Sequence, residues 1–165
     1  MTFPRLAWSG LAVVALHNAE EGLTIPRWLA SRGAELEVLF HFRPPAVEPA
    51  RLYVGLVLAT VLPALWIALV SRAAPRSPGA YSILVLYGIF LANAFVPHLL
   101  GAALLRGYVP GVLTAGLLVV PFNVFLARRS LVDDYASKRG LAAALLLAAA
   151  VYVPGLWTLL GLARS

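Results

Sequence analysis

The chain has 165 residues, of which 61% are hydrophobic and 12% are charged, with a formal net charge of +6. A soluble domain of ordinary composition is about 45–50% apolar and about 25% charged, so this composition excludes a typical soluble domain and indicates an integral membrane protein. The absence of cysteine excludes disulfides, thiolate metal sites and cysteine nucleophiles.

Five apolar segments follow one another along the chain, and each is long enough to cross a bilayer as a helix of about 20 residues. They run from Phe3 to Leu23, Leu52 to Val70, Ala80 to Leu105, Val109 to Ala127 and Leu141 to Leu162. Segments that are apolar on every face argue against a β-barrel, whose strands alternate in polarity. We therefore predict an all-α polytopic membrane bundle with about five transmembrane helices, forming a single domain over residues 1–165.

The positive charges lie at the ends of the apolar segments, where loop asymmetry and lipid headgroups explain them, so we expect no nucleic-acid partner. The short loop at residues 71–80 carries two arginines and no acid. This bias predicts that the loop, and with it the N-terminus, lies in the cytoplasm.

The longest connection, residues 24–50, mixes aromatic and aliphatic residues such as Trp28 and Leu36 with charges, and it ends in a proline-rich stretch. This pattern is typical of an amphipathic helix that lies in the membrane interface. We expect it to cover the outer end of the bundle.

The first apolar segment ends in "ALHNAEEGLTIP", which places His17, Glu20 and Glu21 where burial of each charge is costly. Residues three and four apart share one face of a helix, so the imidazole and the carboxylates can converge. They could hold a divalent metal, or pair a general base with a ligand. The alternative is that both glutamates only end the helix in the headgroup layer.

The third apolar segment carries a second polar cluster, Asn93 and His98, within a stretch that has no charge. His17 lies about 21 Å along its helix and His98 about 27 Å along its own, so both reach the outer half of the bilayer. Since intramembrane ionisable groups usually face the bundle interior, we predict a site between the first and third helices. A structural network that only pins the two helices together is the alternative. The five-residue offset between Asn93 and His98 is awkward on an ideal helix, and Pro97 predicts a kink or bulge that would correct it.

The motifs "HNAEE", "NAFVPH" and "GYVPGVLTA" resemble those of the bacterial membrane family named after its HXXEE motif, over roughly residues 11–121. His17, Glu20 and Glu21 match the naming motif, whereas Asn93 and His98 are one residue further apart than in the family pattern. The resemblance implies a polytopic protein of the bacterial cytoplasmic membrane. It implies no reaction, because the family's biochemical role is unsettled.

Two histidines with one or two carboxylates suit a divalent transition metal, Zn²⁺ first and Fe²⁺ or Mn²⁺ next, better than Ca²⁺ or Mg²⁺. We expect His17, His98 and Glu21 as metal ligands, and Glu20 and Glu21 as the catalytic carboxylates, although spacing does not say which is ligand and which is base. A metal beside a general base is typical of metal-assisted hydrolysis. Hydrogen bonding around the ligands is expected from Asn93, Tyr108 and Thr114. Pro110 is expected to begin the fourth helix.

The expected substrate is a membrane lipid or a lipid-like amphiphile that enters from the bilayer. A phosphate headgroup could be held by arginines that otherwise serve as interfacial anchors, namely Arg27, Arg43, Arg51 and Arg106. His41 could add a ligand or be an ordinary interfacial residue. Other hypotheses remain open: a non-haem iron oxygenase or desaturase, a metal-free isoprenoid isomerase or cyclase, and a non-catalytic membrane subunit or small transporter, with a homo-oligomer possible in each case.

Overall fold

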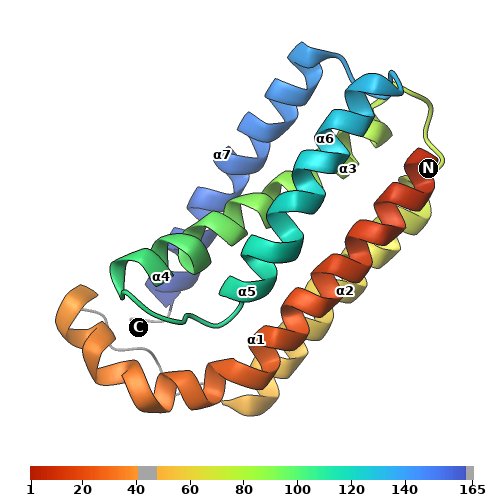
Figure 1. Cartoon of the computed structure of the whole chain (residues 1–165). Helices are drawn as coiled ribbons and strands as arrows, with labels where there is room; N and C mark the ends of the chain where they lie inside the picture. The colour runs from red at the N-terminus through yellow and green to blue at the C-terminus, as the bar shows by residue number, and fades with distance from the viewer. Residues whose placement is uncertain (41–47, 163–165) are drawn as a thin grey trace.

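The structure, a computed structural model, describes residues 1–40 and 48–162, and this part of the chain is all-helical. Its main helices form an elongated bundle (Figure 1). In chain order the elements are α1 (Phe3–Phe40), α2 (Pro49–Val70), α3 (Pro78–Asn93), η1 (Ala94–Leu99), α4 (Leu100–Leu104), α5 (Val112–Thr114), η2 (Ala115–Val119), α6 (Val120–Val132) and α7 (Lys138–Leu162). The all-α prediction is confirmed for the described residues.

Four membrane-length helical runs are present in the described part of the chain: Pro49–Val70, Pro78–Leu104, Val112–Val132 and Lys138–Gly155. Each is long and apolar enough to cross a bilayer. Their outward faces carry exposed aliphatic side chains, such as Leu69 at 78% exposure on α2 and Leu117 at 72% on η2, which suit contact with lipid. An integral membrane protein agrees with these helices, while α1 as a fifth span and the cytoplasmic N-terminus stay predictions.

α1 is longer than the sequence pattern suggested. It continues from the first apolar segment through Pro26 to Phe40 as one helix of 38 residues, where we expected a separate amphipathic segment. A proline inside a helix removes one backbone hydrogen bond and favours bending. Figure 1 shows the later part of α1 turning across the end of the bundle toward α4. Residues 41–47, including the expected sites His41 and Arg43, lie outside the described residues.

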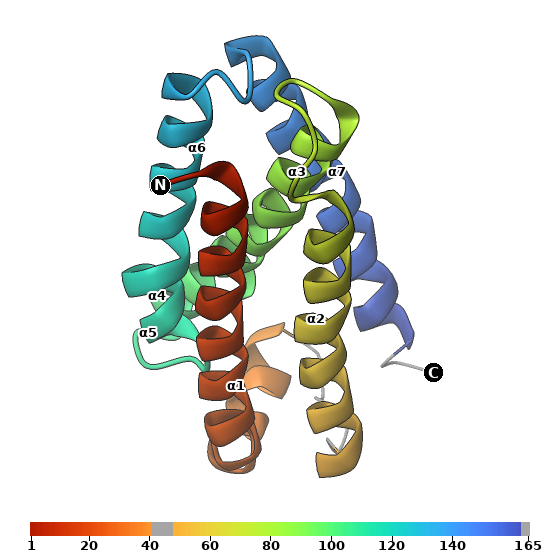
Figure 2. The same cartoon turned by 90° about the vertical axis from the view of Figure 1, so that its right-hand side faces the viewer.

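α1 and α2 lie side by side along most of the length of α2, as both views show (Figures 1 and 2). The buried amide of Asn18 joins them: its Nδ2 donates to Oγ1 of Thr60 at 2.8 Å and to the carbonyl oxygen of Leu56 at 3.3 Å. A polar link of this kind fixes the register of two helices whose other contacts are apolar.

α3 packs closely against α7. A Cβ added at Gly88 of α3 would lie only 2.7 Å from the Cβ of Ala148 of α7, so small residues on both sides allow the approach. The main apolar core lies at the end of the bundle nearest the N-terminus, where Phe3, Leu6 and Tyr87 are buried together. The buried histidines His17 and His98 lie outside this apolar core.

Candidate metal centre

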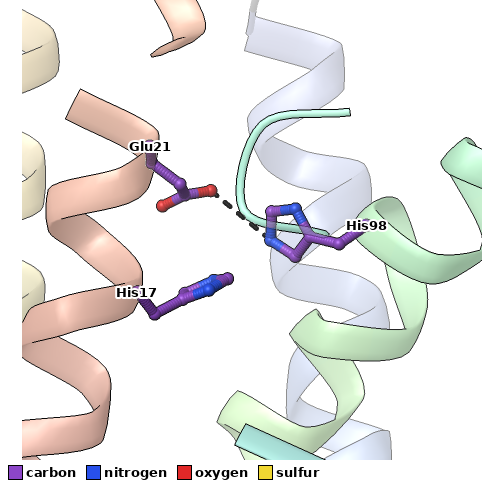
Figure 3. A group of neighbouring side chains, drawn as sticks. All are labelled: His17, Glu21 and His98. Carbon is purple, nitrogen blue, oxygen red and sulfur yellow. Dashed lines mark ion pairs between the residues drawn. The ribbon is translucent and has the colours of Figure 1, made fainter. Parts of the chain in front are cut away.

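His17, Glu21 and His98 converge near the end of the bundle opposite the N-terminus (Figure 3). One potential ligand atom from each residue lies within 4.8 Å of the other two. The two histidine side chains are buried, and their rings meet edge to face with centroids 4.7 Å apart. Oε1 of Glu21 lies 3.4 Å from Nε2 of His98. The predicted meeting of the first and third apolar helices is thus confirmed.

The distortion expected at Pro97 brings Asn93 and His98 together. The segment Ala94–Leu99 is a π-type turn, and Val96 within it leaves the helical region with φ −132° and ψ 116°. The amide Nδ2 of Asn93 consequently lies 3.0 Å from Nε2 of His98 and 3.4 Å from Nε2 of His17. The extra residue in the turn compensates for the five-residue offset.

The carbonyl oxygen of Pro110 determines which nitrogen of His98 carries the proton. It lies 2.6 Å from Nδ1 of His98, and a carbonyl oxygen can only accept a hydrogen bond. Nδ1 is therefore the donor. In the neutral imidazole the lone pair is then on Nε2, the atom that faces Glu21 and Asn93.

A threonine hydroxyl determines the proton position on His17 in the same way. Oγ1 of Thr114 donates its single proton to Oε2 of Glu20 at 2.6 Å, so it must accept from Nδ1 of His17 at 2.8 Å. The lone pair of His17 is again on Nε2.

Each buried imidazole thus donates its Nδ1–H to an acceptor and keeps its lone pair on Nε2. Both Nε2 atoms lie beside the Asn93 amide, and that of His98 also lies beside the Glu21 carboxylate. Metal-binding histidines in proteins usually have this arrangement, in which the second ring nitrogen donates to a carbonyl or carboxylate and fixes the tautomer. The donor set of two nitrogens and one carboxylate oxygen fits Zn²⁺, Fe²⁺ or Mn²⁺. This part of the chain could hold a divalent transition metal.

Glu20 faces a different set of partners from Glu21. Its carboxylate accepts from the backbone N–H of Thr114 at 2.8 Å, the Tyr108 hydroxyl at 2.8 Å and the backbone N–H of Leu113 at 3.4 Å, besides the Thr114 hydroxyl. These N–H groups belong to the first turn of α5, whose positive end favours a carboxylate. Glu20 therefore anchors the start of α5 to α1. Thr114 bonds to His17 and Glu20, and Tyr108 bonds to Glu20, while their expected part in orienting metal ligands stays a prediction.

Gly111 fits between the two histidine rings. Its φ of +82° lies in the left-handed region, and an added Cβ would be 2.7 Å from Cε1 of His98 and 2.9 Å from Cε1 of His17. The expectation that Pro110 begins a helix is wrong, since α5 begins at Val112. The Pro110–Gly111 step instead supplies a carbonyl acceptor and a close backbone approach.

Contacts of two side chains, Tyr152 and Trp28, were not anticipated from the sequence. The hydroxyl of Tyr152 on α7 reaches Oδ1 of Asn93 at 3.0 Å and the carbonyl oxygen of Val96, and Nε1 of Trp28 donates to the carbonyl oxygen of Tyr108 at 2.7 Å. A tyrosine in an apolar helix and a tryptophan in a connection also fit ordinary packing, so sequence alone carried no signal for these contacts. Among the arginines considered for headgroup binding, Arg51 pairs with Glu48 at 2.7 Å, while Arg27 and Arg106 are exposed.

Comparison with known proteins agrees with the motifs. The model of a family described as "protein of unknown function with HXXEE motif" matches residues 8–126. A curated relative, the uncharacterized protein YrkK of Bacillus subtilis (strain 168), is 30% identical over 111 residues. That match covers 67% of this chain and 65% of the relative, so the chain spans less than two thirds of the length of that protein. No solved structure matches.

Proposed function

We propose that this chain, which belongs to the family of proteins of unknown function with an HXXEE motif, is a membrane-embedded, metal-dependent hydrolase of a lipid or other amphiphile. The observation that carries the proposal is the convergence of one potential ligand atom from each of His17, Glu21 and His98 within 4.8 Å, with the lone pair of each histidine on Nε2. His17, His98 and Glu21 would be the ligands, with Zn²⁺ as the first candidate and Fe²⁺ or Mn²⁺ as the others.

Hydrogen bonding around the cluster supports a metal more than it supports a purely structural lock. A lock would rely on the Asn93 amide, whose Nδ2 lies 3.0 Å from Nε2 of His98 but 3.4 Å from Nε2 of His17, beyond the usual hydrogen-bond distance. Here both Nδ1–H groups are already donated outward, to the carbonyl oxygen of Pro110 and to the hydroxyl of Thr114. The inward side of the cluster is therefore rich in lone pairs, which a cation would stabilise.

A divalent ion at this point would lower the pKa of a water toward about 7 and polarise an ester or phosphoester oxygen. Glu21 would hold the ion through one carboxylate oxygen, and its second oxygen could accept the proton of the water. With an ion held there, attack of the water oxygen on the acyl carbon or phosphorus would break the bond to the leaving alcohol, and the carboxylate would pass its proton to the leaving oxygen. Glu20 would act through Thr114 by keeping the Nδ1 proton on His17, and its earlier expected part as a base stays a prediction.

The surroundings of the cluster favour an amphiphilic substrate. Phe95 at 50% exposure, Val96 at 37% and Leu100 at 49% flank His98 on the outside of the bundle. In a membrane these side chains face the acyl chains, so a substrate with a hydrocarbon tail would reach the site from the bilayer. A polar headgroup would then meet Tyr108, which is 38% exposed.

The test is hydrolysis by purified protein reconstituted in vesicles of phosphatidylethanolamine and phosphatidylglycerol, with p-nitrophenyl octanoate as a second probe. We expect release of fatty acid, phosphate or nitrophenol by metal-loaded protein, and loss of this release after chelation and in His98→Ala. Asn123→Ala is the matched control, because the Asn123 amide bonds only to the Val119 carbonyl of its own helical run, at 2.9 Å, among the contacts described.

Other outcomes would contradict the hydrolase. Products that gain oxygen only in the presence of O₂ would indicate an oxygenase or desaturase. Isomerised or cyclised products that persist in chelator would indicate metal-free acid–base chemistry. Lower thermal stability in His98→Ala, with no turnover of either probe by the metal-loaded wild type, would indicate a structural lock.

A further inference from the structure

The side chain of Asn93 lies where a fourth ligand of the proposed metal would lie. Its terminal amide atom is 3.0 Å from Nε2 of His98 and 3.4 Å from Nε2 of His17, and Oε1 of Glu21 is 3.4 Å from Nε2 of His98. Ligand atoms about 2.1 Å from one ion, at angles between octahedral and tetrahedral, lie roughly 3.0–3.4 Å from one another. The distances from Nε2 of His98 to Asn93 and to Glu21 fall in this range, while the ligand atoms of His17, Glu21 and His98 taken together lie within 4.8 Å of one another.

The Asn93 amide can turn either atom toward the histidines. The oxygen and nitrogen of a carboxamide are close in size and exchange places by a half-turn of the last bond, and their hydrogen-bond partners decide between them. In one orientation the NH₂ group faces both Nε2 atoms and the oxygen faces Tyr152. In the other the oxygen faces the histidines and the NH₂ group faces Tyr152.

In the first orientation, the single hydroxyl proton of Tyr152 faces two acceptors and can satisfy only one of them. Its hydroxyl lies against two atoms that can both only accept, the carbonyl oxygen of Val96 and Oδ1 of Asn93, which is 3.0 Å away. A phenol carries one proton, so the hydroxyl satisfies one of them. If the proton goes to Val96, the Tyr152 oxygen can accept from the NH₂ group of Asn93, and every group in the chain Asn93–Tyr152–Val96 is then satisfied.

The second orientation needs a cation. It directs an amide oxygen at two imidazole lone pairs, because Nδ1 of each histidine already carries the proton. Three lone pairs and a carboxylate around one point repel one another unless a positive ion lies between them. The two orientations therefore correspond to the site without metal and the site with metal.

We propose that Asn93 is a fourth metal ligand through Oδ1, and that the Tyr152 hydroxyl, bonded to the Val96 carbonyl, holds the amide in the binding orientation. This inference rests on the proposed metal centre and specifies its ligand set as two nitrogens and two oxygens. Such a set leaves an open position only at a five- or six-coordinate ion. Fe²⁺ and Mn²⁺ adopt such geometries readily, and Zn²⁺ does so by expanding its shell.

The test uses Co²⁺ as a visible-absorbing probe, added to the full chain in detergent, with affinity measured by competition against a chromophoric chelator. We expect Asn93→Leu to weaken Co²⁺ binding about 100-fold and to change the d–d spectrum. Asn93→Asp, which keeps an oxygen at the same place, should bind at least as tightly as wild type. Tyr152→Phe should weaken binding about tenfold, as expected for loss of a group that orients a ligand.

Matched controls separate ligand loss from unfolding. Asn123→Leu removes another buried amide, and Tyr87→Phe removes another hydroxyl that donates to a backbone carbonyl, that of Ala7. Both should bind Co²⁺ like wild type. An unchanged Co²⁺ spectrum and affinity in Asn93→Leu would overturn the Asn93 assignment and leave the three-ligand centre standing. Binding by Asn93→Asp as weak as that of Asn93→Leu would overturn it as well. No Co²⁺ binding by folded wild type would overturn the metal centre itself.

Discussion

His17 and Glu20, three residues apart on α1, are joined through the single hydroxyl of Thr114, which accepts from Nδ1 of His17 at 2.8 Å and donates to Oε2 of Glu20 at 2.6 Å. Two of the three motif residues therefore set the state of the His17 imidazole. His17 presents Nε2 to the cluster, and Glu20, through Thr114, keeps the ring proton on Nδ1. Glu21, the third, faces the cluster directly.

Replacing the hydroxyl should uncouple this pair. We expect Thr114→Val to weaken binding of a divalent metal by about 10- to 100-fold, because His17 loses the acceptor that keeps its proton on Nδ1. Thr114→Ser should retain wild-type affinity. The measurement is competition against a chelator, with Thr60→Val, at the contact between α1 and α2, as the control. Equal metal affinity in Thr114→Val and wild type would contradict a role for the Thr114 hydroxyl in orienting His17.

Glu20→Gln should destabilise the fold near α5. The glutamine would bring an NH₂ group toward donors from Thr114, Leu113 and Tyr108, so at least one of them loses its acceptor, at a cost of about 1–3 kcal/mol. Thermal unfolding in detergent measures the change. Glu48→Gln, whose exposed carboxylate pairs only with the exposed Arg51 among the contacts described, provides the comparison for loss of one carboxylate. A Glu20→Gln protein as stable as wild type would contradict the anchoring role.

Gly111→Ala should damage the site through the backbone. A left-handed conformation costs a residue with a Cβ about 1–2 kcal/mol, and the added methyl would also displace the rings of His17 and His98. We expect a lower unfolding temperature together with weaker metal binding. Gly55→Ala, on α2 where the added Cβ meets nothing within 4 Å, should change neither. Normal metal affinity in Gly111→Ala would show that the close approach is not needed.

The orientation in the membrane can be tested with single cysteines, since the chain has none. The exposed residues Ala74, between α2 and α3, and Ser31, on the later part of α1, serve as the labelling sites. We expect Ala74→Cys to be labelled from the cytoplasm and Ser31→Cys from the other side by a membrane-impermeant maleimide. The reverse pattern would overturn the cytoplasmic N-terminus.

Much of the architecture follows from hydrophobicity alone, because a membrane-spanning helix must satisfy its own backbone and is apolar over a defined length. The meeting of His17 with His98 was also predictable, since polar residues in such helices seek one another. The continuation of α1 past Leu23 was not, because Pro26 and the charges after it suggested an end. Packing of the later part of α1 near Tyr108 outweighs that local signal.

The hydrogen-bond partners of the site residues could not be predicted, because they include backbone groups that the sequence does not distinguish. Backbone carbonyls look the same at every position, so the acceptor role of Pro110 could be found only from the fold. The distinct roles of Glu20 and Glu21 likewise depend on where the first turn of α5 lies. The spacing in the sequence places both carboxylates on neighbouring faces of α1. Only the position of α5 shows that Glu20 bonds to the backbone there, whereas Glu21 faces His98.

The most direct test of the metal centre is the metal content of wild type, His17→Ala and His98→Ala, purified in mild detergent without a histidine tag and measured by inductively coupled plasma mass spectrometry. We predict about one equivalent of a transition metal in wild type and loss of it in both variants. A folded wild type that contains no transition metal, even after incubation with Zn²⁺, Fe²⁺ and Mn²⁺ in turn, would contradict the metal centre.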